Sequence, residues 1–230
     1  MLATSRITAE RLRSRLLDNQ VSPDLMWSTL RDVPTEDRDA WLDVVLDTQE
    51  LHDDEPDLPR GCVPYLPCPV STVLDVIDRA SVTPDDVFVD VGCGLGRTVF
   101  LAHLLTGAGC IGIEIQSALT QLAIGRAQWL NLTRTRFIHA DAVDLIGFIS
   151  VGTVFFLYCP FSGERLERLL DELEGIARTR QIRVCCVDMA PLQRPWLTRV
   201  ESASAAFDLY YSGQVEGLAP RDLLGTQRST

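Results

Sequence analysis

The sequence of 230 residues contains no lysine, so all 21 of its basic side chains are arginines. A phosphate-binding loop of the Walker type and a Schiff-base mechanism both need a lysine, and both are therefore excluded. The 32 acidic residues leave a net charge of −11. This charge argues against non-specific nucleic-acid binding, because such binding depends on excess positive charge.

Long apolar runs and clustered metal ligands are also missing. No stretch of about 18 apolar residues is present, so no transmembrane helix is expected. The N-terminal segment has neither the continuous apolar run nor the small-residue cleavage site of a signal peptide. The seven cysteines form no C-x-x-C pair and the three histidines are scattered, so we expect reduced thiols and no metal site. These absences favour a cytoplasmic protein without membrane association.

The acidic residues are concentrated near the N-terminus. Residues 32–57 contain eleven acids and one base, Arg38, which gives −10 of the total −11. The first 60 residues have the pattern of short helices, with an apolar stripe that begins at Trp41. We expect residues 1–60 to form a helical cap. Its acids form either the solvated face of a helix or a surface that attracts a cationic partner such as a basic peptide.

From Pro69 onward, helical and extended patterns alternate along the chain. Short apolar runs rich in β-branched residues predict strands at 87–92, 110–115, 136–141, 153–159, 182–189, 197–203 and 206–213. Repeated strand–helix units predict an α/β fold, a doubly wound Rossmann-like sheet of seven strands with helices on both faces. The last two strands form an antiparallel hairpin. We expect residues 61–215 to form this domain and residues 216–230 to form a C-terminal tail.

The turn after the first predicted strand, VDVGCGLGR, carries an acid, Asp90, and three alternate glycines, Gly92, Gly94 and Gly96. Glycine permits positive φ and lets a ligand approach the backbone closely. A dinucleotide-binding turn has the spacing G-x-G-x-x-G/A, and Arg97 stands here in the place of the last small residue. This mismatch disfavours an NAD(P)-dependent oxidoreductase, which nevertheless stays an alternative.

The D-x-G-x-G-x-G turn resembles the first motif of class I S-adenosylmethionine-dependent methyltransferases, and the resemblance covers about residues 60–215. It implies S-adenosyl-L-methionine as the cofactor, with Asp90 near its amino group and the glycines along its methionine and ribose. Glu114 ends the second strand, where such enzymes bind the ribose hydroxyls. Asp141 and Ala142 end the third strand, where they bind the adenine ring.

The segment ahead of the first strand, VPYLPCPVSTVLDVI, is similar to the Y-x-P-T-P segment of the non-SET histone lysine methyltransferases. These are the disruptor-of-telomeric-silencing type, and their bacterial relatives share the segment. The resemblance implies that Tyr65 and Ser71 contact the methionine end of the cofactor, although Tyr65 could equally be a packing residue of this proline-rich loop. Cys68 stands where threonine is usual, which removes one hydroxyl from this contact.

The fourth predicted strand ends in Tyr158-Cys159-Pro160-Phe161, where the family carries its acceptor-site motif. Enzymes that methylate amines often have Asn or Asp before the proline and the aromatic residue, and Cys159 replaces that polar side chain here. The backbone carbonyls of Tyr158 or Cys159, or the Tyr158 hydroxyl, remain candidates to orient the acceptor. Phe161 either packs against the acceptor or the cofactor, or belongs to the core.

The resemblance as a whole implies S-adenosylmethionine-dependent methyl transfer to an unidentified acceptor. This acceptor is a small molecule or a basic peptide or protein, and the acidic N-terminal segment favours a cationic one. A non-catalytic scaffold that binds the cofactor, or nothing, stays a second alternative, because Cys159 replaces the polar side chain of the acceptor-site motif.

Overall fold

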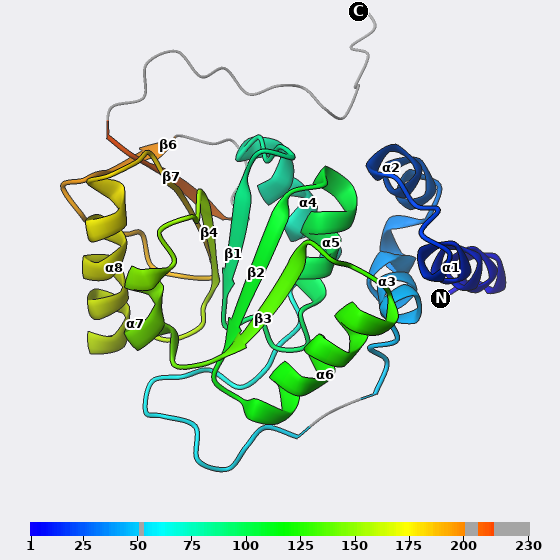
Figure 1. The fold of residues 1–230 in the computed structure, drawn as a ribbon, viewed down its shortest axis with the longest axis horizontal. Coiled ribbons are helices and arrows are strands. Elements are labelled where there is room, and N and C mark those ends of the chain that lie inside the picture. Colours follow the sequence, from blue (N-terminus) through cyan, green and yellow to red (C-terminus); the bar gives the residue numbers. More distant parts are fainter. Residues whose placement is uncertain (51–52, 201–206, 214–230) are drawn as a thin grey trace, which may run out of the picture.

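A computed structural model describes residues 1–50, 53–200 and 207–213 of the chain (Figure 1). Its elements in chain order are α1 (Ala3–Leu17), α2 (Pro23–Arg31), the 3-10 helix η1 (Thr35–Asp37), α3 (Arg38–Leu46), α4 (Val70–Arg79), β1 (Val87–Val91), α5 (Arg97–Thr106), β2 (Gly109–Glu114), α6 (Ser117–Trp129), β3 (Thr135–His139), α7 (Ala142–Leu145), the 3-10 helix η2 (Ile146–Phe148), β4 (Val154–Tyr158), α8 (Glu164–Ala177), β5 (Arg183–Val187), β6 (Leu197–Val200) and β7 (Asp208–Ser212).

The strands form one seven-stranded sheet in the order β3-β2-β1-β4-β5-β7-β6. The first five strands are parallel, and β7 runs antiparallel to both β5 and β6. The predicted Rossmann-like sheet with an antiparallel final hairpin is therefore confirmed. Strand order reverses between β1 and β4, and ligands of such sheets bind beyond the carboxyl ends of the strands at this switch point.

Both faces of the sheet are covered by helices. Phe88 and Phe156 point to the face that packs against α4 and α5. Phe155 and Leu157 point to the opposite face, against α7 and α8. Figure 1 shows these helices on either side of the sheet, with α1, α2 and α3 outside the layer of α5 and α6. Because both faces are buried, the strands are nearly continuous apolar runs, which made them predictable.

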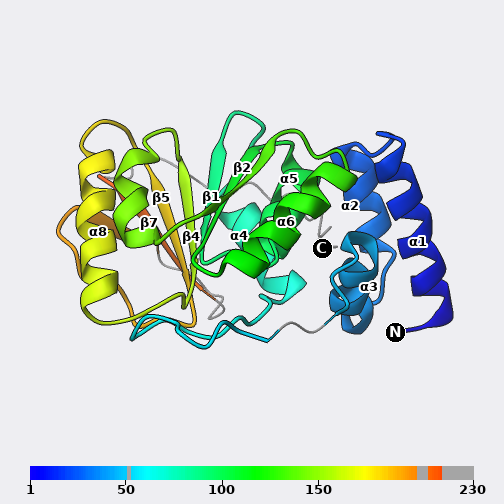
Figure 2. The same cartoon turned by 60° about the horizontal axis from the view of Figure 1, so that its bottom comes forward.

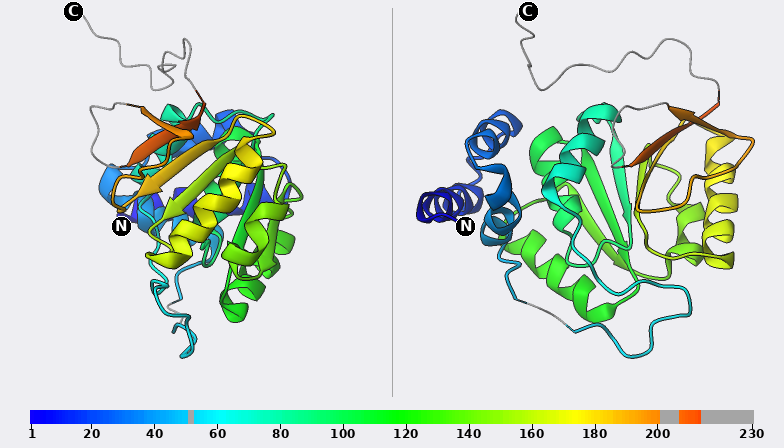
Figure 3. Two further views of the ribbon diagram at one scale, coloured as in Figure 1. Left: turned by 90° about the vertical axis from the view of Figure 1, so that its left-hand side faces the viewer. Right: turned by 180° about the vertical axis from the view of Figure 1, so that it is seen from behind.

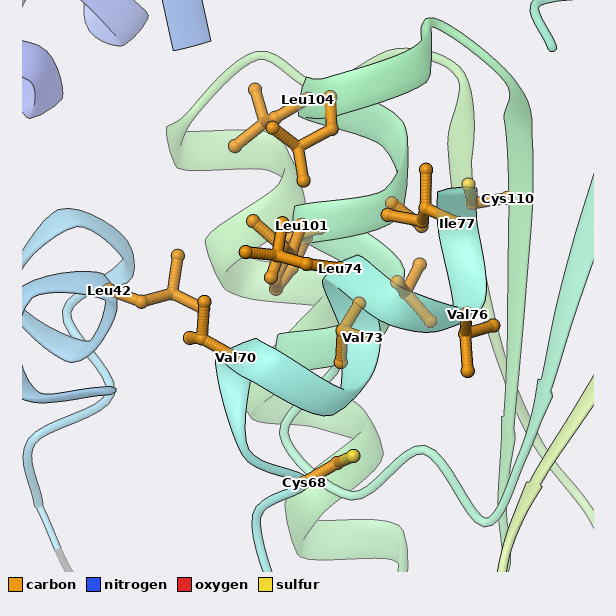
Figure 4. Close-up of a cluster of buried hydrophobic side chains, with 14 of the residues drawn as sticks. Leu42, Cys68, Val70, Val73, Leu74, Val76, Ile77, Leu101, Leu104 and Cys110 are labelled. Atoms are coloured by element: carbon orange, nitrogen blue, oxygen red, sulfur yellow. The ribbon is translucent and has the colours of Figure 1, made fainter. Parts of the chain in front are cut away.

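The N-terminal helices share a hydrophobic core with the sheet domain. α1 packs on α3, and α2 packs on α5. Trp41 of α3 is fully buried, and its indole Nε1 donates to Thr8 Oγ1 at 3.1 Å. Figure 4 shows Leu42 of α3 beside Val70 of α4, which in turn lies against α5. The cap therefore extends one side of the molecule and lies on the far side from β6 and β7 (Figure 3).

A few predicted segments differ from the structure or lie outside its described residues. The helical turns α7 and η2 between β3 and β4 were not predicted, because four and three residues are too short for a periodic pattern. Residues 201–206, which contain parts of two predicted strands, and the tail predicted at 216–230 are outside the described ranges. Within those ranges, we find no helix whose length and hydrophobicity would suit a membrane span.

Candidate functional site

A cavity of about 200 Å³ opens at the carboxyl ends of the central strands. Its outer wall comes from the segment of residues 53–69, which we call the crossing segment. Figures 1 and 2 show this segment in cyan, passing along the edge of the sheet where the strands end. The predicted site residues that line the cavity are Tyr65, Gly92, Glu114, Asp141, Ala142, Tyr158, Cys159 and Phe161.

Four other predicted site residues do not line this cavity. Gly94 and Gly96 lie in the same loop as Gly92, and Asp90 is buried at the end of β1 with 3% of its surface exposed. Ser71 lies in the first turn of α4 and is exposed. The structure does not bring Ser71 to the cavity, because α4 begins at Val70, after the crossing segment has passed the strand ends.

The glycine loop leaves no space for side chains at two of its positions. Gly94 has a φ of 51°, and a Cβ there would overlap the ring of Tyr65. Gly96 has a φ of 79° and caps α5, and a Cβ there would overlap the ring of Phe137. Both backbones are in the left-handed region that glycine adopts most readily. At these two positions, a side chain would occupy the space that the rings of Tyr65 and Phe137 now fill.

Glu114 is the central carboxylate of the cavity and is 6% exposed. Its Oε2 accepts a hydrogen bond from the Gly94 amide at 2.8 Å, and its Oε1 accepts from the Gln116 amide at 2.9 Å. Burial raises the pKa of Glu114, and these two amides oppose that shift. Each carboxylate oxygen retains a second acceptor position. Two hydroxyl groups of a ribose match these positions.

Asp90 is a buried carboxyl group that has no partner within residues 1–50, 53–200 and 207–213. Among the residues that the structure describes, neither a hydrogen bond nor an ion pair reaches its side chain. Burial raises the pKa of Asp90 to about 8, and the charge of Glu114 adds to the shift. A buried, unpaired carboxylate is unfavourable. A cationic group bound beside Gly92 would satisfy it, and the positively charged amino group of S-adenosylmethionine meets this requirement. The residues present therefore fit the implied cofactor.

Asp141 lies at the end of β3 and has two partners. Its Oδ1 accepts from the amide of Val143 at 3.0 Å, as the N-cap of α7. The same oxygen pairs with Nη2 of Arg165 at 2.6 Å. The Arg165 guanidinium also lies over the Phe161 ring, 5.3 Å from its centroid. Oδ2 of Asp141 makes neither contact, so it is the oxygen available to an adenine amine.

Asp54 is one of the residues that hold the crossing segment in place. Its Oδ1 accepts from the amide of Tyr65 at 2.9 Å and from Nε2 of Gln116 at 2.7 Å. The amide of Val63 donates to the carbonyl of Pro160 at 3.2 Å. These contacts join the ends of β2 and β4 across the cavity and press the Tyr65 ring onto the glycine loop. Burial raises the pKa of Tyr65 to about 12, so the hydroxyl stays protonated at neutral pH.

The ends of β4 and β5 form the other half of the cavity. Tyr158 pairs in register with Val187, so the residues that follow, Cys159 and Asp188, are neighbours. Both have left-handed backbones, with φ values of 42° and 52°. Such values are uncommon for residues with side chains. Phe161 is 5% exposed and belongs both to the cavity wall and to the core.

Several residues that build the site were not found from the sequence. Arg165 and Asp54 act through partners far away in the chain, which a local pattern does not reveal. Asp188 was predicted to lie inside the strand at 182–189, whereas β5 ends at Val187. Its position just after a strand that ends near the switch point is the signal that could have identified it.

The acids of the N-terminal cap do not line the cavity, although they were one candidate surface for a cationic partner. Among the described residues of 1–57, none contributes to the cavity wall. Asp43 Oδ1 accepts from Nε of Arg97 at 2.8 Å, and Asp39 Oδ1 accepts from Nη2 of the same arginine at 2.9 Å. These two acids therefore hold α3 against the start of α5.

Comparison with known proteins gives matches to methyltransferases. Residues 67–140 match the family model "Histone methylation protein DOT1". A protein-lysine N-methyltransferase of Saccharolobus islandicus (strain REY15A) is 29% identical over 98 residues, which cover 41% of this chain and 61% of that protein. The chain thus matches less than two thirds of the length of this curated relative.

Solved structures give a similar result. A putative methyltransferase, yhhF from Escherichia coli, is 20% identical with a TM-score of 0.52, and the match covers 68% of this chain and 90% of that chain. An RNA methyltransferase from Salinibacter ruber, in complex with S-adenosyl-L-homocysteine, is 23% identical with a TM-score of 0.48 and coverages of 68% and 98%.

These findings confirm the resemblance predicted from the sequence. The region matched by the family model contains Asp90, the glycine loop and Glu114, and the likeness to the Escherichia coli structure shows a shared fold. The matches oppose the oxidoreductase alternative, and the cofactor that this fold and these residues imply is S-adenosylmethionine. The chain has the fold of the class I S-adenosylmethionine-dependent methyltransferases, and its residues 67–140 match the model of the DOT1 family.

Proposed function

We propose that this protein transfers a methyl group from S-adenosylmethionine to a lysine side chain of a protein. The observation that carries the proposal is the buried Asp90 carboxyl group, which has no partner among the described residues and lies beside the glycine loop and Glu114. The name of the Saccharolobus relative supports lysine as the acceptor residue. The description of the matched family, histone methylation, supports a basic protein as the acceptor.

Two carboxylates that line the cofactor side of the cavity, and Asp90 buried beside it, would each have a role. Asp90 would hold the amino group, Glu114 the two ribose hydroxyls, and Oδ2 of Asp141 the adenine amine. The backbone of Ala142 would lie along the ring edge, since this residue lines the cavity directly after Asp141. Tyr65 closes the cavity from the crossing segment. These contacts would exclude water and fix the direction in which the cofactor lies.

On the acceptor side of the cavity, methyl transfer requires little acid or base chemistry from the protein. When bound, S-adenosylmethionine supplies a methyl group on a sulfonium, whose S–C bond breaks as the new N–C bond forms and the amine releases one proton. The protein therefore has mainly to align the acceptor nitrogen and to exclude water. Tyr158 and Cys159 line the cavity, and their carbonyl oxygens or the Tyr158 hydroxyl would align the acceptor. Phe161 would limit the space for the acceptor.

The first test is binding of S-adenosylhomocysteine, measured by calorimetry. The wild-type protein should bind it, and the Glu114→Ala/Asp141→Ala double variant should bind about a hundredfold more weakly, because it loses hydrogen bonds to charged groups. The control is Glu10→Ala/Asp171→Ala, which removes two exposed acids outside the cavity and should bind normally. Equal affinity in the wild type and the Glu114/Asp141 variant would refute the assignment.

The second test is transfer of a radiolabelled methyl group to proteins of a cell extract, followed by hydrolysis and amino-acid analysis. The chain itself contains no lysine, so any labelled methyl-lysine must come from an acceptor protein. We expect labelled methyl-lysine with the wild type and none with the double variant. Label found only on other residues would contradict lysine as the acceptor.

A further inference from the structure

The carboxylates of the cavity are divided between its two halves. Glu114 ends β2 and Asp141 follows β3, on the side of the switch point that the glycine loop occupies. Asp188 follows β5, on the other side, and also lines the cavity. The acceptor must reach the cofactor from the side that the cofactor leaves open. Asp188 is therefore the carboxylate on the acceptor side.

The charge of Asp188 is not neutralised by an arginine among the residues that the structure describes. Arg165, the basic residue of the cavity wall, pairs with Asp141 at 2.6 Å. None of the ion pairs within the described ranges involves Asp188, and its side chain is exposed. Asp141 is thus paired with an arginine, whereas Asp188 has no cationic partner among the described residues and lies within hydrogen-bond range of the Tyr158 hydroxyl.

Asp188 lies close to the residue that was predicted to orient the acceptor. Burial raises the pKa of the Tyr158 hydroxyl, and the nearby charge of Asp188 raises it further. The two strand ends also share an unusual backbone, since Cys159 and Asp188 are both left-handed. Left-handed conformations of residues with side chains are unfavourable and cluster at functional sites. Two such residues on adjacent strand ends indicate a shaped site.

We propose that Asp188 binds the positively charged amino group of the incoming lysine and thereby selects cationic acceptors, with the Tyr158 hydroxyl beside it. This inference rests on the proposed function. A carboxylate pairs with an ammonium group through a charge-assisted hydrogen bond. Because transfer requires the neutral amine, Asp188 acts in capture of the acceptor, before the amine releases its proton. Its contribution belongs to acceptor binding and not to the rate of transfer.

The matched variants are Asp188→Asn and Asp85→Asn. Asparagine has nearly the volume of aspartate and also tolerates a left-handed backbone, so the first variant removes the charge without straining the chain. Asp85 is exposed and precedes β1, at the opposite edge of the sheet from the cavity. The second variant therefore changes the net charge by the same amount at a distant place.

The experiment measures binding of a fluorescent oligolysine peptide to the protein saturated with S-adenosylhomocysteine, and then the kinetics of methylation of that peptide. We expect Asp188→Asn to weaken peptide binding and to raise KM about tenfold, with kcat within about twofold of the wild type. Asp85→Asn should behave as the wild type. The fully acetylated peptide should bind all three proteins equally weakly, because it carries no ammonium group.

Three outcomes would overturn the inference. They are unchanged peptide binding in Asp188→Asn, an equal loss in Asp85→Asn, and a fall in kcat at unchanged KM. A wild-type protein that binds S-adenosylhomocysteine but does not distinguish the lysine peptide from the acetylated peptide would also overturn it, while the cofactor assignment would survive. A wild-type protein that fails to bind S-adenosylhomocysteine would refute the proposed function itself.

Discussion

Nε of Arg97 donates to Oδ1 of Asp43 at 2.8 Å, and this contact joins the glycine loop to the N-terminal cap. Arg97 is the first residue of α5, directly after Gly96. Its guanidinium is 6% exposed and also donates to the carbonyl of Cys68 at 2.8 Å. One arginine therefore fixes the cap, the crossing segment and the start of α5 relative to one another. Arg97 stands where a dinucleotide-binding turn would have a small residue. In this fold it therefore has a structural role.

Replacing Arg97 by glutamine should destabilise the protein by about 2 kcal/mol, because the Cys68 carbonyl and the partly exposed Asp43 would lose a charged hydrogen-bond donor. Urea unfolding followed by circular dichroism measures this change. Arg168→Gln is the control, since Arg168 pairs with Asp144 on the surface and such pairs contribute less than about 1 kcal/mol. If both variants lost the same stability, the Arg97 contacts would not hold the cap.

The parts of the fold that were predictable are those encoded by local patterns. The first five strands are buried on both faces, so each is a short apolar run between turn residues. Their ends then located Glu114 and Asp141, because parallel strands present their carboxyl ends at one edge. The acids at the ends of β1, β2 and β3 were found in this way, without knowledge of which side chains meet.

The parts that were not predictable depend on contacts between distant residues. The pairing of Arg165 with Asp141 joins residues 24 positions apart, and that of Arg97 with Asp43 joins residues 54 positions apart. The second pairing also changes how the acidic N-terminal segment is interpreted. A count of charges suggested a surface for a cationic partner, whereas the structure uses Asp43 to pair with an internal arginine.

Gly94→Ala should weaken binding of S-adenosylhomocysteine at least tenfold, because the new methyl group would displace the Tyr65 ring from the loop. The positive φ of 51° adds roughly 1 kcal/mol of strain. Calorimetry measures the affinity. Gly125→Ala is the control, since nothing lies within 4 Å of a Cβ there and alanine favours a helix. A Gly94→Ala protein with wild-type affinity would show that the loop is not part of the cofactor site.

Asp54→Ala should loosen the crossing segment, because Asp54 accepts hydrogen bonds from both the Tyr65 amide and the Gln116 side chain. We expect a severalfold weaker affinity for S-adenosylhomocysteine and faster hydrogen exchange in residues 53–69, measured by mass spectrometry. Asp53→Ala removes the same charge from the exposed neighbouring residue and should change neither quantity. If Asp53→Ala and Asp54→Ala changed the affinity and the hydrogen exchange equally, the effect would come from the negative charge of the segment and not from the hydrogen bonds of Asp54.

The stability of the ligand-free protein should fall as pH rises, in part because of Asp90. Its pKa in the folded protein is about 8, against an ordinary value of 3.8. Between these values the folded chain keeps a proton that the unfolded chain has lost, so each increase in pH favours unfolding. The contribution of this one group is at most about 1.4 kcal/mol per pH unit. Unfolding in urea between about pH 5 and pH 8 measures the slope.

Asp90→Asn should remove the contribution of Asp90 to the pH dependence of the unfolding free energy, because the amide does not titrate. Relative to the wild type, the variant should therefore gain more stability near pH 8 than near pH 5. Asp85→Asn should keep the wild-type slope, since Asp85 is exposed before β1. Saturation with S-adenosylhomocysteine should also reduce the slope in the wild type, because a bound ammonium group favours the ionised form of Asp90. Parallel slopes in the wild type and Asp90→Asn would mean that Asp90 is already ionised, and therefore that another cation reaches it in the ligand-free protein.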